Sequence, residues 1–221
     1  MRALLLSLTA LAMASSAPAF AAVVINFDNV KTDENALFAG STNVASTTLI
    51  ANTNQSNAAV TFNNMLGLFA NASGQSSTTS SSDGLFGMTS VTIADGFGFS
   101  TASFNLPGIS GNAPPVEATS VLVEVLGLNG SVIESAILAL SGAGENRIGI
   151  SGTAGEQFSG FRLSFAPSDG GVEALTQVRL GGVGSISAVP EPATWGMMIM
   201  GFALMGAAMR RKDRSLRVRY S

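Results

Sequence analysis

Short apolar runs recur about every ten residues between positions 22 and 189, and they constrain the fold more than any other feature. Glycine, serine, asparagine and proline gather between the runs, as is typical of turns. No stretch of this region shows the spacing of an amphipathic helix, so it cannot supply the crossover helices of a parallel sheet. We predict an antiparallel all-β sandwich or jelly roll, with strands at residues 23–28, 58–63, 85–94, 97–106, 119–128, 131–140, 147–151, 160–166 and 175–180.

The clearest turn is Asn129-Gly130, which lies between two runs rich in β-branched residues. Both residues tolerate positive φ, so we expect a two-residue type I′ turn that pairs Leu128 with Ser131. The core face of this hairpin is then expected to carry Val121, Val123, Val125, Val132, Ala136 and Leu138. A loop is expected over the other face, which holds Leu126, Ile133 and Ile137.

Residues 73–82 are mostly serine and threonine and include no apolar side chain. A segment of this composition cannot contribute to a core, so we predict a mobile surface loop. A loop that carries attached glycans is the alternative interpretation of the same residues.

Charge is segregated along the chain. Residues 22–189 hold four basic and twelve acidic residues, whereas six of the eleven basic residues of the chain follow Met209. The acidic region should repel nucleic acid, so we expect no nucleic-acid partner. The chain has no cysteine and no histidine, which removes disulfides, thiolate nucleophiles, the commonest general base and the commonest transition-metal ligand. We therefore predict no catalytic residue, no metal site and no cofactor.

A pair of carboxylates is the one familiar hydrolase arrangement that this composition leaves open. Glu124 and Glu134 are the nearest pair, but the hairpin register sends them to opposite faces of the sheet. We therefore expect that the protein is not an enzyme.

Sugar-binding domains often use tryptophan and tyrosine as platforms, but Trp195 and Tyr220 both lie outside the domain. Its phenylalanines are instead expected in the core: Phe27, Phe62, Phe97, Phe99, Phe104, Phe161 and Phe165. Polar and acidic loop residues, among them Asp28, Asp33, Glu34 and Asp169, leave a loop-mediated glycan- or calcium-binding module as the alternative function. The threonines of the domain do not repeat as a flat ice-binding array would.

The N-terminus has the parts of a signal peptide. A short basic start at Met1-Arg2 is followed by an apolar run over residues 3–14 and by small residues in Ala19-Phe20-Ala21. We predict a signal helix within residues 1–21 and cleavage after Ala21.

The C-terminal region contains seventeen consecutive residues without a charge, 193–209. At about 1.5 Å per residue a helix of this length reaches roughly 25 Å, which favours a single membrane-spanning segment. Trp195 would lie at one interface, and the basic residues from Arg210 onward would stay in the cytoplasm. This topology places the β domain on the periplasmic side of the inner membrane.

The same region carries a family resemblance. Val189, Pro190, Glu191 and Pro192, then Trp195, a short apolar helix and the basic stop Arg210-Arg211-Lys212 closely resemble the PEP-CTERM sorting signal of Gram-negative bacteria, in its tryptophan-containing subgroup. Gly196 departs from the alanine that is usual in that subgroup. The resemblance covers only about the last thirty residues of the chain.

The resemblance implies which enzyme processes the protein and where the protein is finally located. In this family an exosortase processes the signal near Pro-Glu-Pro, so the helix serves as a transient membrane handle and the protein reaches the cell surface or an extracellular matrix containing exopolysaccharide. Similar tails occur on proteins described as ice-binding, so that label would rest on the tail alone. The expected organisation is a signal peptide at 1–21, a β-sandwich ectodomain at 22–188 and a sorting signal at 189–221. The sorting signal divides into an extended motif at 189–192, a helix at 193–209 and a basic tail at 210–221.

Overall fold

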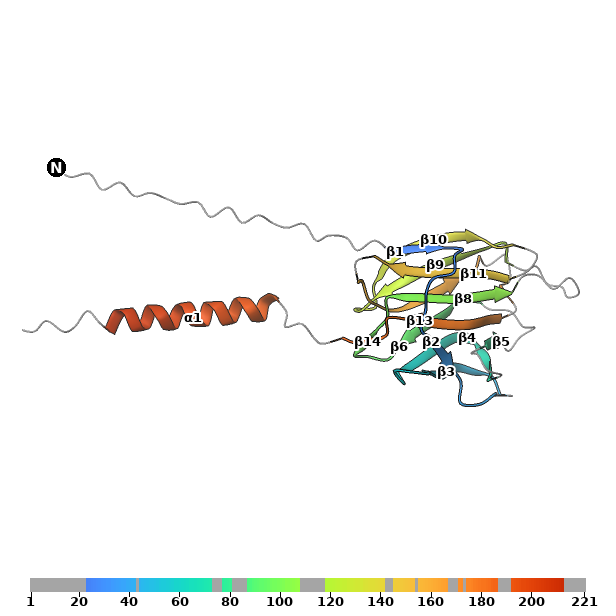
Figure 1. Cartoon of the computed structure of the whole chain (residues 1–221), viewed down its shortest axis with the longest axis horizontal. Helices are drawn as coiled ribbons and strands as arrows, with labels where there is room; N and C mark the ends of the chain where they lie inside the picture. The colour runs from blue at the N-terminus through green and yellow to red at the C-terminus, as the bar shows by residue number, and fades with distance from the viewer. Residues whose placement is uncertain are drawn as a thin grey trace, which may run out of the picture.

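The computed structural model describes residues 23–42, 44–72, 77–80, 87–107, 118–141, 145–153, 155–166, 171–172, 174–186 and 192–212. A domain of β-strands precedes one helix, α1 (Pro192–Lys212) (Figure 1). The strands are β1 Val23–Asn26, β2 Glu34–Leu37, β3 Ser46–Thr53, β4 Ala59–Asn71, β5 Ser77–Ser80, β6 Thr89–Ile93, β7 Phe97–Gly98, β8 Thr101–Pro107, β9 Ser120–Gly127, β10 Val132–Ala139, β11 Glu145–Gly152, β12 Phe158–Ser164, β13 Ala174–Gly181 and β14 Gly184–Ser185.

One large sheet contains twelve of these strands, and its path runs β1-β11-β8-β13-β2-β3-β4-β6-β12-β9-β10. The strand pairings are antiparallel, which confirms the prediction of an antiparallel all-β domain. The sheet folds back on itself, because β5 pairs with both β4 and β13 and because the two end strands, β1 and β10, lie close together. The sheet is therefore nearly barrel-shaped, and the finer prediction of a jelly roll is not confirmed.

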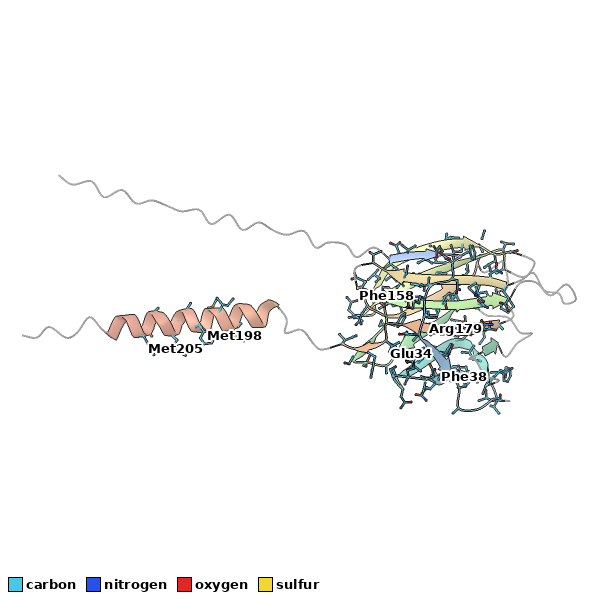
Figure 2. All side chains as sticks on the ribbon, in the orientation of Figure 1. Glu34, Phe38, Phe158, Arg179, Met198 and Met205 are labelled. Carbon is cyan, nitrogen blue, oxygen red and sulfur yellow. The ribbon has the colours of Figure 1, made fainter. Side chains whose placement is uncertain are left out.

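The fold has two layers, with phenylalanine pairs in the space that the sheet encloses. We call β1-β11-β8-β13, which faces the viewer in Figure 1, the back layer, and β3-β4-β6-β12-β9-β10 the front layer. Phe104 on β8 stacks on Phe161 of β12, with ring centroids 4.7 Å apart and planes 8° from parallel. Two further pairs, Phe38 with Phe62 and Phe99 with Phe158, have centroids 5.2 and 5.6 Å apart (Figure 2 labels Phe38 and Phe158). The stacked Phe104–Phe161 pair joins the two layers, and the tilted and edge-to-face pairs belong to the same hydrophobic core.

Most of the predicted core phenylalanines are confirmed. Phe62, Phe99, Phe104 and Phe161 are at most 1% exposed, and Phe97 and Phe165 pack against the core as partly buried residues. Phe27 is a correction, because its side chain is 48% exposed. The cause is local: β1 ends at Asn26, so Phe27 no longer follows the alternation of a strand.

The β-structure also includes segments that the sequence pattern did not predict. β2, β3 and β5 are short or rich in threonine and serine, so they lack the apolar alternation on which the prediction relied. The prediction of a mobile loop over residues 73–82 is wrong for Ser77–Ser80, which form β5 between β4 and β13. Backbone hydrogen bonds on both edges can hold such a strand whatever its side chains are.

The β9–β10 hairpin has the predicted register, but its turn differs from the predicted one. The Gly130 N–H donates to the Gly127 carbonyl over 2.8 Å, and Gly127 N–H donates to the Ser131 carbonyl over 2.8 Å, so the loop has three residues. Only Gly130 has positive φ, 76°, which makes the two-residue type I′ turn wrong. The ladder then shifts between Val132 and Glu134. This bulge absorbs one residue and restores the expected register farther along the hairpin.

The faces of this hairpin are only partly as expected. Val121, Val123 and Val125 are fully buried, but Val132 is 43% exposed, which corrects its assignment to the core. The predicted loop over the other face is wrong at Ile137, which is 74% exposed. β10 is the last strand of the sheet: among the described strands it is hydrogen-bonded to β9, and β1 lies near it without pairing.

Glu34 ties the start of β2 to the turn between β3 and β4 (Figure 2). Glu34 is 6% exposed, and its carboxylate accepts hydrogen bonds from the Ser56 backbone N–H and hydroxyl over 2.9 and 2.8 Å. Burial alone would raise the pKa of Glu34, but these bonds, with others from Thr53 and Gln55, together lower that pKa below its ordinary value of 4.5. The ionised carboxylate therefore stabilises this corner of the sheet.

Replacing Glu34 with glutamine should lower the free energy of unfolding by about 1–2 kcal/mol at neutral pH, because hydrogen bonds to a charged acceptor become bonds to a neutral one. A lowered pKa gives stability that is present above the unfolded-state pKa and is lost as pH falls through the folded-state pKa. The difference between wild type and Glu34→Gln should thus shrink as pH drops below about 4.5.

Urea unfolding at a series of pH values measures this difference. The exposed Glu134, substituted in the same way, is the control and should change stability little at any pH. A Glu34→Gln deficit that stays constant down to the lowest pH would show that the charge of Glu34 contributes nothing.

Candidate binding hollow and sorting segment

A row of polar residues crosses the outer face of the front layer. Each member is the direct cross-strand partner of the next, so the row runs perpendicular to β3, β4, β6, β12, β9 and β10. In order its residues are Thr48, Asn63, Ser90, Arg162, Glu124 and Ser135. We call this set the polar row. In the central strands of the row, neighbours of its members point inward to the core, as at Val91, Phe161 and Val125.

Two interactions organise the polar row. The Thr48 hydroxyl donates to Asn63 Oδ1 over 2.7 Å. Arg162 Nε donates to Glu124 Oε2 over 2.9 Å, and the side chains of this ion pair are 33% and 21% exposed. Arg162 points outward from its strand, between the buried Phe161 and Leu163. The ion pair fixes both side chains and leaves part of each polar group open to solvent.

A hollow with a volume of about 470 Å³ lies over the central part of this row. Its lining combines hydroxyl, amide, guanidinium and apolar groups: Thr47, Thr48, Asn63, Asn64, Met65, Met88, Ser90, Thr92, Leu126, Gly130 and Arg162. The volume lies within the range of pockets that hold small ligands, about 300–1,000 Å³.

The rim of the hollow comes from two irregularities of the backbone. The β3–β4 register shifts between Ser46 and Thr48, and the surplus residues of β4 include Met65, which is 86% exposed. Gly67 has φ 84° at this bulge. At the other end Gly130 belongs to the three-residue turn of the β9–β10 hairpin. Regular strands thus form the floor, and the bulge and the turn contribute to the walls.

The lining supplies hydrogen-bond donors and acceptors with little charge. Among the described residues of the lining, Arg162 is the only ionisable one, and Glu124 pairs with it. The other carboxylate considered from the sequence, Glu134, is opposite Val125, while Glu124 is opposite Ser135, so the expected separation of the two carboxylates onto different faces is confirmed. The hollow can therefore recognise a hydroxylated ligand by hydrogen bonds.

The outer face of the back layer also has amide, carboxylate and guanidinium side chains, but these hydrogen-bond to one another. Asn105 is 1% exposed, donates to Glu145 over 2.7 Å and accepts from Arg147 Nε over 3.2 Å. On neighbouring β13, the buried Nε of Arg179 has no hydrogen-bond partner among the described residues (Figure 2). Asn105 is satisfied within the protein, which distinguishes this network from the open hollow on the front layer.

The acidic residues considered as calcium ligands each accept hydrogen bonds from a different part of the domain. Asp33 Oδ1 accepts a hydrogen bond from the Gly182 N–H over 3.2 Å, and Glu34 accepts one from the Ser56 N–H. Asp28 Oδ1 accepts from the backbone N–H of the next residue over 2.7 Å. In the part of the chain that the structure describes, no three acidic side chains form a group that could hold a metal ion. Asp169 lies outside the described residues.

The C-terminal segment forms α1, which begins one residue before and ends three residues after the predicted helix of residues 193–209. Pro192 is its first residue, which corrects the expectation that 189–192 is extended throughout: proline has no N–H to lose there, and its fixed φ suits a helix start. Trp195 lies in the first turns of α1, and Arg210, Arg211 and Lys212 are its last residues. Val189, Pro190 and Glu191 lie outside the described residues, as do the predicted signal peptide and its helix.

The side chains of residues 196–209 of α1 are exposed, including Met198 and Met205 (Figure 2). Within the described residues, none of the helices is both long enough and apolar enough to cross a membrane. The prediction that residues 193–209 span a membrane is therefore not supported by this structure.

A β domain followed by an apolar helix with a basic end has the layout of a protein with a C-terminal sorting segment. Residues 188–212 match the family model of the PEP-CTERM protein-sorting motif. The chain therefore carries this motif, as the resemblance indicated; the match does not distinguish a subgroup. Neither the comparison with curated proteins nor that with solved structures gives a significant match.

Sequence reasoning identified the motif but not the hollow. The motif is contiguous, whereas the hollow gathers residues from β3, β4, β6, β9 and β12 and from one turn. Its sequence signal is weak: outward polar residues that alternate with buried ones, as at Asn63, Ser90 and Arg162. The alternation was visible on individual strands, but the order of the strands was not.

Proposed function

We propose that this chain is an exported, non-enzymatic protein of the cell envelope or exopolysaccharide matrix, sorted by an exosortase that acts on its C-terminal segment. The observation that carries the proposal is the PEP-CTERM match over residues 188–212, directly after the last strand of the β domain. The signal peptide predicted at residues 1–21 supplies the export step.

The C-terminal segment acts in this proposal as a processing handle at the inner membrane. Its apolar side chains and the basic end at Arg210, Arg211 and Lys212 hold the protein there with the tail on the cytoplasmic side. A permanent anchor has no need of Pro190 and Pro192, so the prolines favour a processed segment. Pro190 restricts the residue before it to extended backbone, which suits entry into a protease-like active site.

In a host with an exosortase, the protein recovered from the extracellular or matrix fraction should lack Trp195 and everything after it. A strain without the exosortase should keep the chain ending at Ser221 in its membrane fraction. Intact-mass spectrometry of both fractions measures this difference, and the same spectra report whether the N-terminus follows Ala21.

Glu191→Gln is expected to reduce processing, while Glu156→Gln, in the β domain, is the matched control and should be processed normally. If both strains contain the same membrane-bound species ending at Ser221, the handle proposal is wrong.

A second candidate function is a glycan-binding module. The specific observation that favours it is the hollow over the polar row, which offers hydrogen-bonding groups on an exported domain. The site differs from the loop-mediated one that the sequence left as the alternative, because its floor is the sheet itself. Calcium binding has no comparable observation in its favour among the described residues.

A further inference from the structure

We propose that the hollow on the front layer binds a segment of a neutral, extended polysaccharide that lies along the polar row, across the strands. This inference rests on the second candidate function and deepens it by naming the ligand class and its orientation. The site consists of Thr48, Asn63, Ser90, Thr92 and the Arg162–Glu124 pair.

The geometry of the row favours an extended ligand. Neighbouring strands are about 4.8 Å apart, so the groups from Thr48 to Glu124 span roughly 19 Å over five strands. The row is therefore longer than a single sugar ring, and its polar groups recur at nearly the interval at which an extended sugar chain repeats. A chain that lies across the strands meets one polar group for each sugar unit, whereas a chain that lies along a strand meets fewer.

The polar groups suit hydroxyl ligands. A carboxylate accepts from two neighbouring hydroxyls, a guanidinium donates in a planar fork, and the amide of Asn63 does both. The ion pair between Arg162 and Glu124 holds the fork and the carboxylate side by side, 2.9 Å apart at their closest atoms. Preorganisation of this kind lowers the entropic cost of ordering side chains when a ligand binds.

The charge distribution favours a neutral polysaccharide over an anionic one. Glu124 pairs with Arg162, the one ionisable residue in the described part of the lining, so those residues offer no surplus positive charge to hold an acidic sugar. The region around it, residues 22–189, has twelve acidic residues against four basic ones and repels polyanions.

Three apolar side chains give the ligand its other contacts. Met65, Met88 and Leu126 line the hollow and can pack against the C–H faces of sugar rings. Methionine is flexible and adapts to irregular surfaces, so it can partly replace the aromatic platform that this domain lacks. Met65 and Met88 are 86% and 50% exposed, which leaves both side chains available to a ligand.

The test is affinity electrophoresis of the full-length chain in detergent. Native gels that contain dextran or hydroxyethylcellulose, both neutral, should retard the protein in at least one case, and gels that contain alginate, a polyanion, should not. The combined variant Ser90→Val and Thr92→Val removes two hydroxyls of the lining and keeps strand-compatible side chains, so its dissociation constant should rise about tenfold.

Thr61→Val is the matched control. Thr61 is the cross-strand partner of Thr92 on the same face, but it does not line the hollow, so its loss should leave retardation unchanged. Circular dichroism checks that all variants keep the fold. The proposal is overturned if neither neutral polysaccharide retards the wild type, if alginate retards it more strongly, or if Thr61→Val weakens binding as much as the lining variant does.

The outcome is separable from that of the sorting experiment. Retardation is measured on purified full-length chain and does not depend on processing, whereas intact mass reports processing and does not depend on binding. Normal processing without retardation would refute the hollow as a polysaccharide site and leave the sorting proposal standing.

Discussion

Replacing Phe161 with alanine is expected to lower the free energy of unfolding by about 3–5 kcal/mol, the usual cost of truncating a large core aromatic. Phe161 is fully buried and stacks on Phe104 with ring centroids 4.7 Å apart. The two rings belong to opposite layers, so the truncation removes a contact that crosses the core as well as the apolar surface of the ring. A relaxed cavity would still leave Phe104 without its partner.

Urea unfolding of the full-length chain, followed by far-UV circular dichroism, measures this loss. Phe27→Ala is the control, because the same atoms are removed from a side chain that is 48% exposed. We expect that variant to unfold within about 1 kcal/mol of the wild type. Equal losses at the two positions would contradict the assignment of Phe161 to the core.

Replacing Gly149 with alanine should also destabilise the fold, by up to about 3 kcal/mol, as overpacking does. A Cβ at this position of β11 would lie 2.3 Å from Val30 Cγ2 and 2.7 Å from the Asp28 carbonyl oxygen. The segment between β1 and β2 passes over β11, β8 and β13 here (Figure 1). It is fixed farther along, where the Thr101 hydroxyl donates to the Lys31 carbonyl over 2.9 Å and Asp33 N–H donates to the Leu180 carbonyl over 3.1 Å.

The displaced segment should become more accessible in Gly149→Ala, so limited proteolysis between β1 and β2 reports the change alongside thermal unfolding. Gly40→Ala is the matched control, since no atom lies within 4 Å of its added Cβ. Normal stability and normal protease resistance of Gly149→Ala would mean that the segment does not pack on β11 as described.

The strands that the sequence predicted correctly are those with a strong apolar alternation. β9 has Val121, Val123 and Val125 inward, and β12 has Phe161 and Leu163 inward, so each could be recognised without knowing its neighbours. β5 has no such pattern, and it exists because β4 and β13 each offer a free edge to it. Local β-propensity therefore does not predict a strand of that kind.

The β9–β10 hairpin shows how a local rule can give a correct register for a wrong reason. The predicted pairing of Leu128 with Ser131 across a two-residue turn implies that Glu124 pairs with Ser135, and the structure has this pairing with a three-residue turn and a bulge. Side-chain burial explains the agreement, because a shift of β10 by one residue against β9 would turn Leu138, which packs against the core, to the outer face. The core therefore set the register, and the turn adapted to it.

The sequence by itself determined the features that need only neighbouring residues: the all-β character, the acidic domain, the basic tail and the sorting motif matched at residues 188–212. The motif is carried by contiguous residues, so no partner strand is needed to recognise it. The hollow and its polar row were decided only by the tertiary structure. Thr48 and Arg162 are far apart in the sequence, and the register of the intervening strands aligns them. That register depends on how the whole core packs, which no local pattern records.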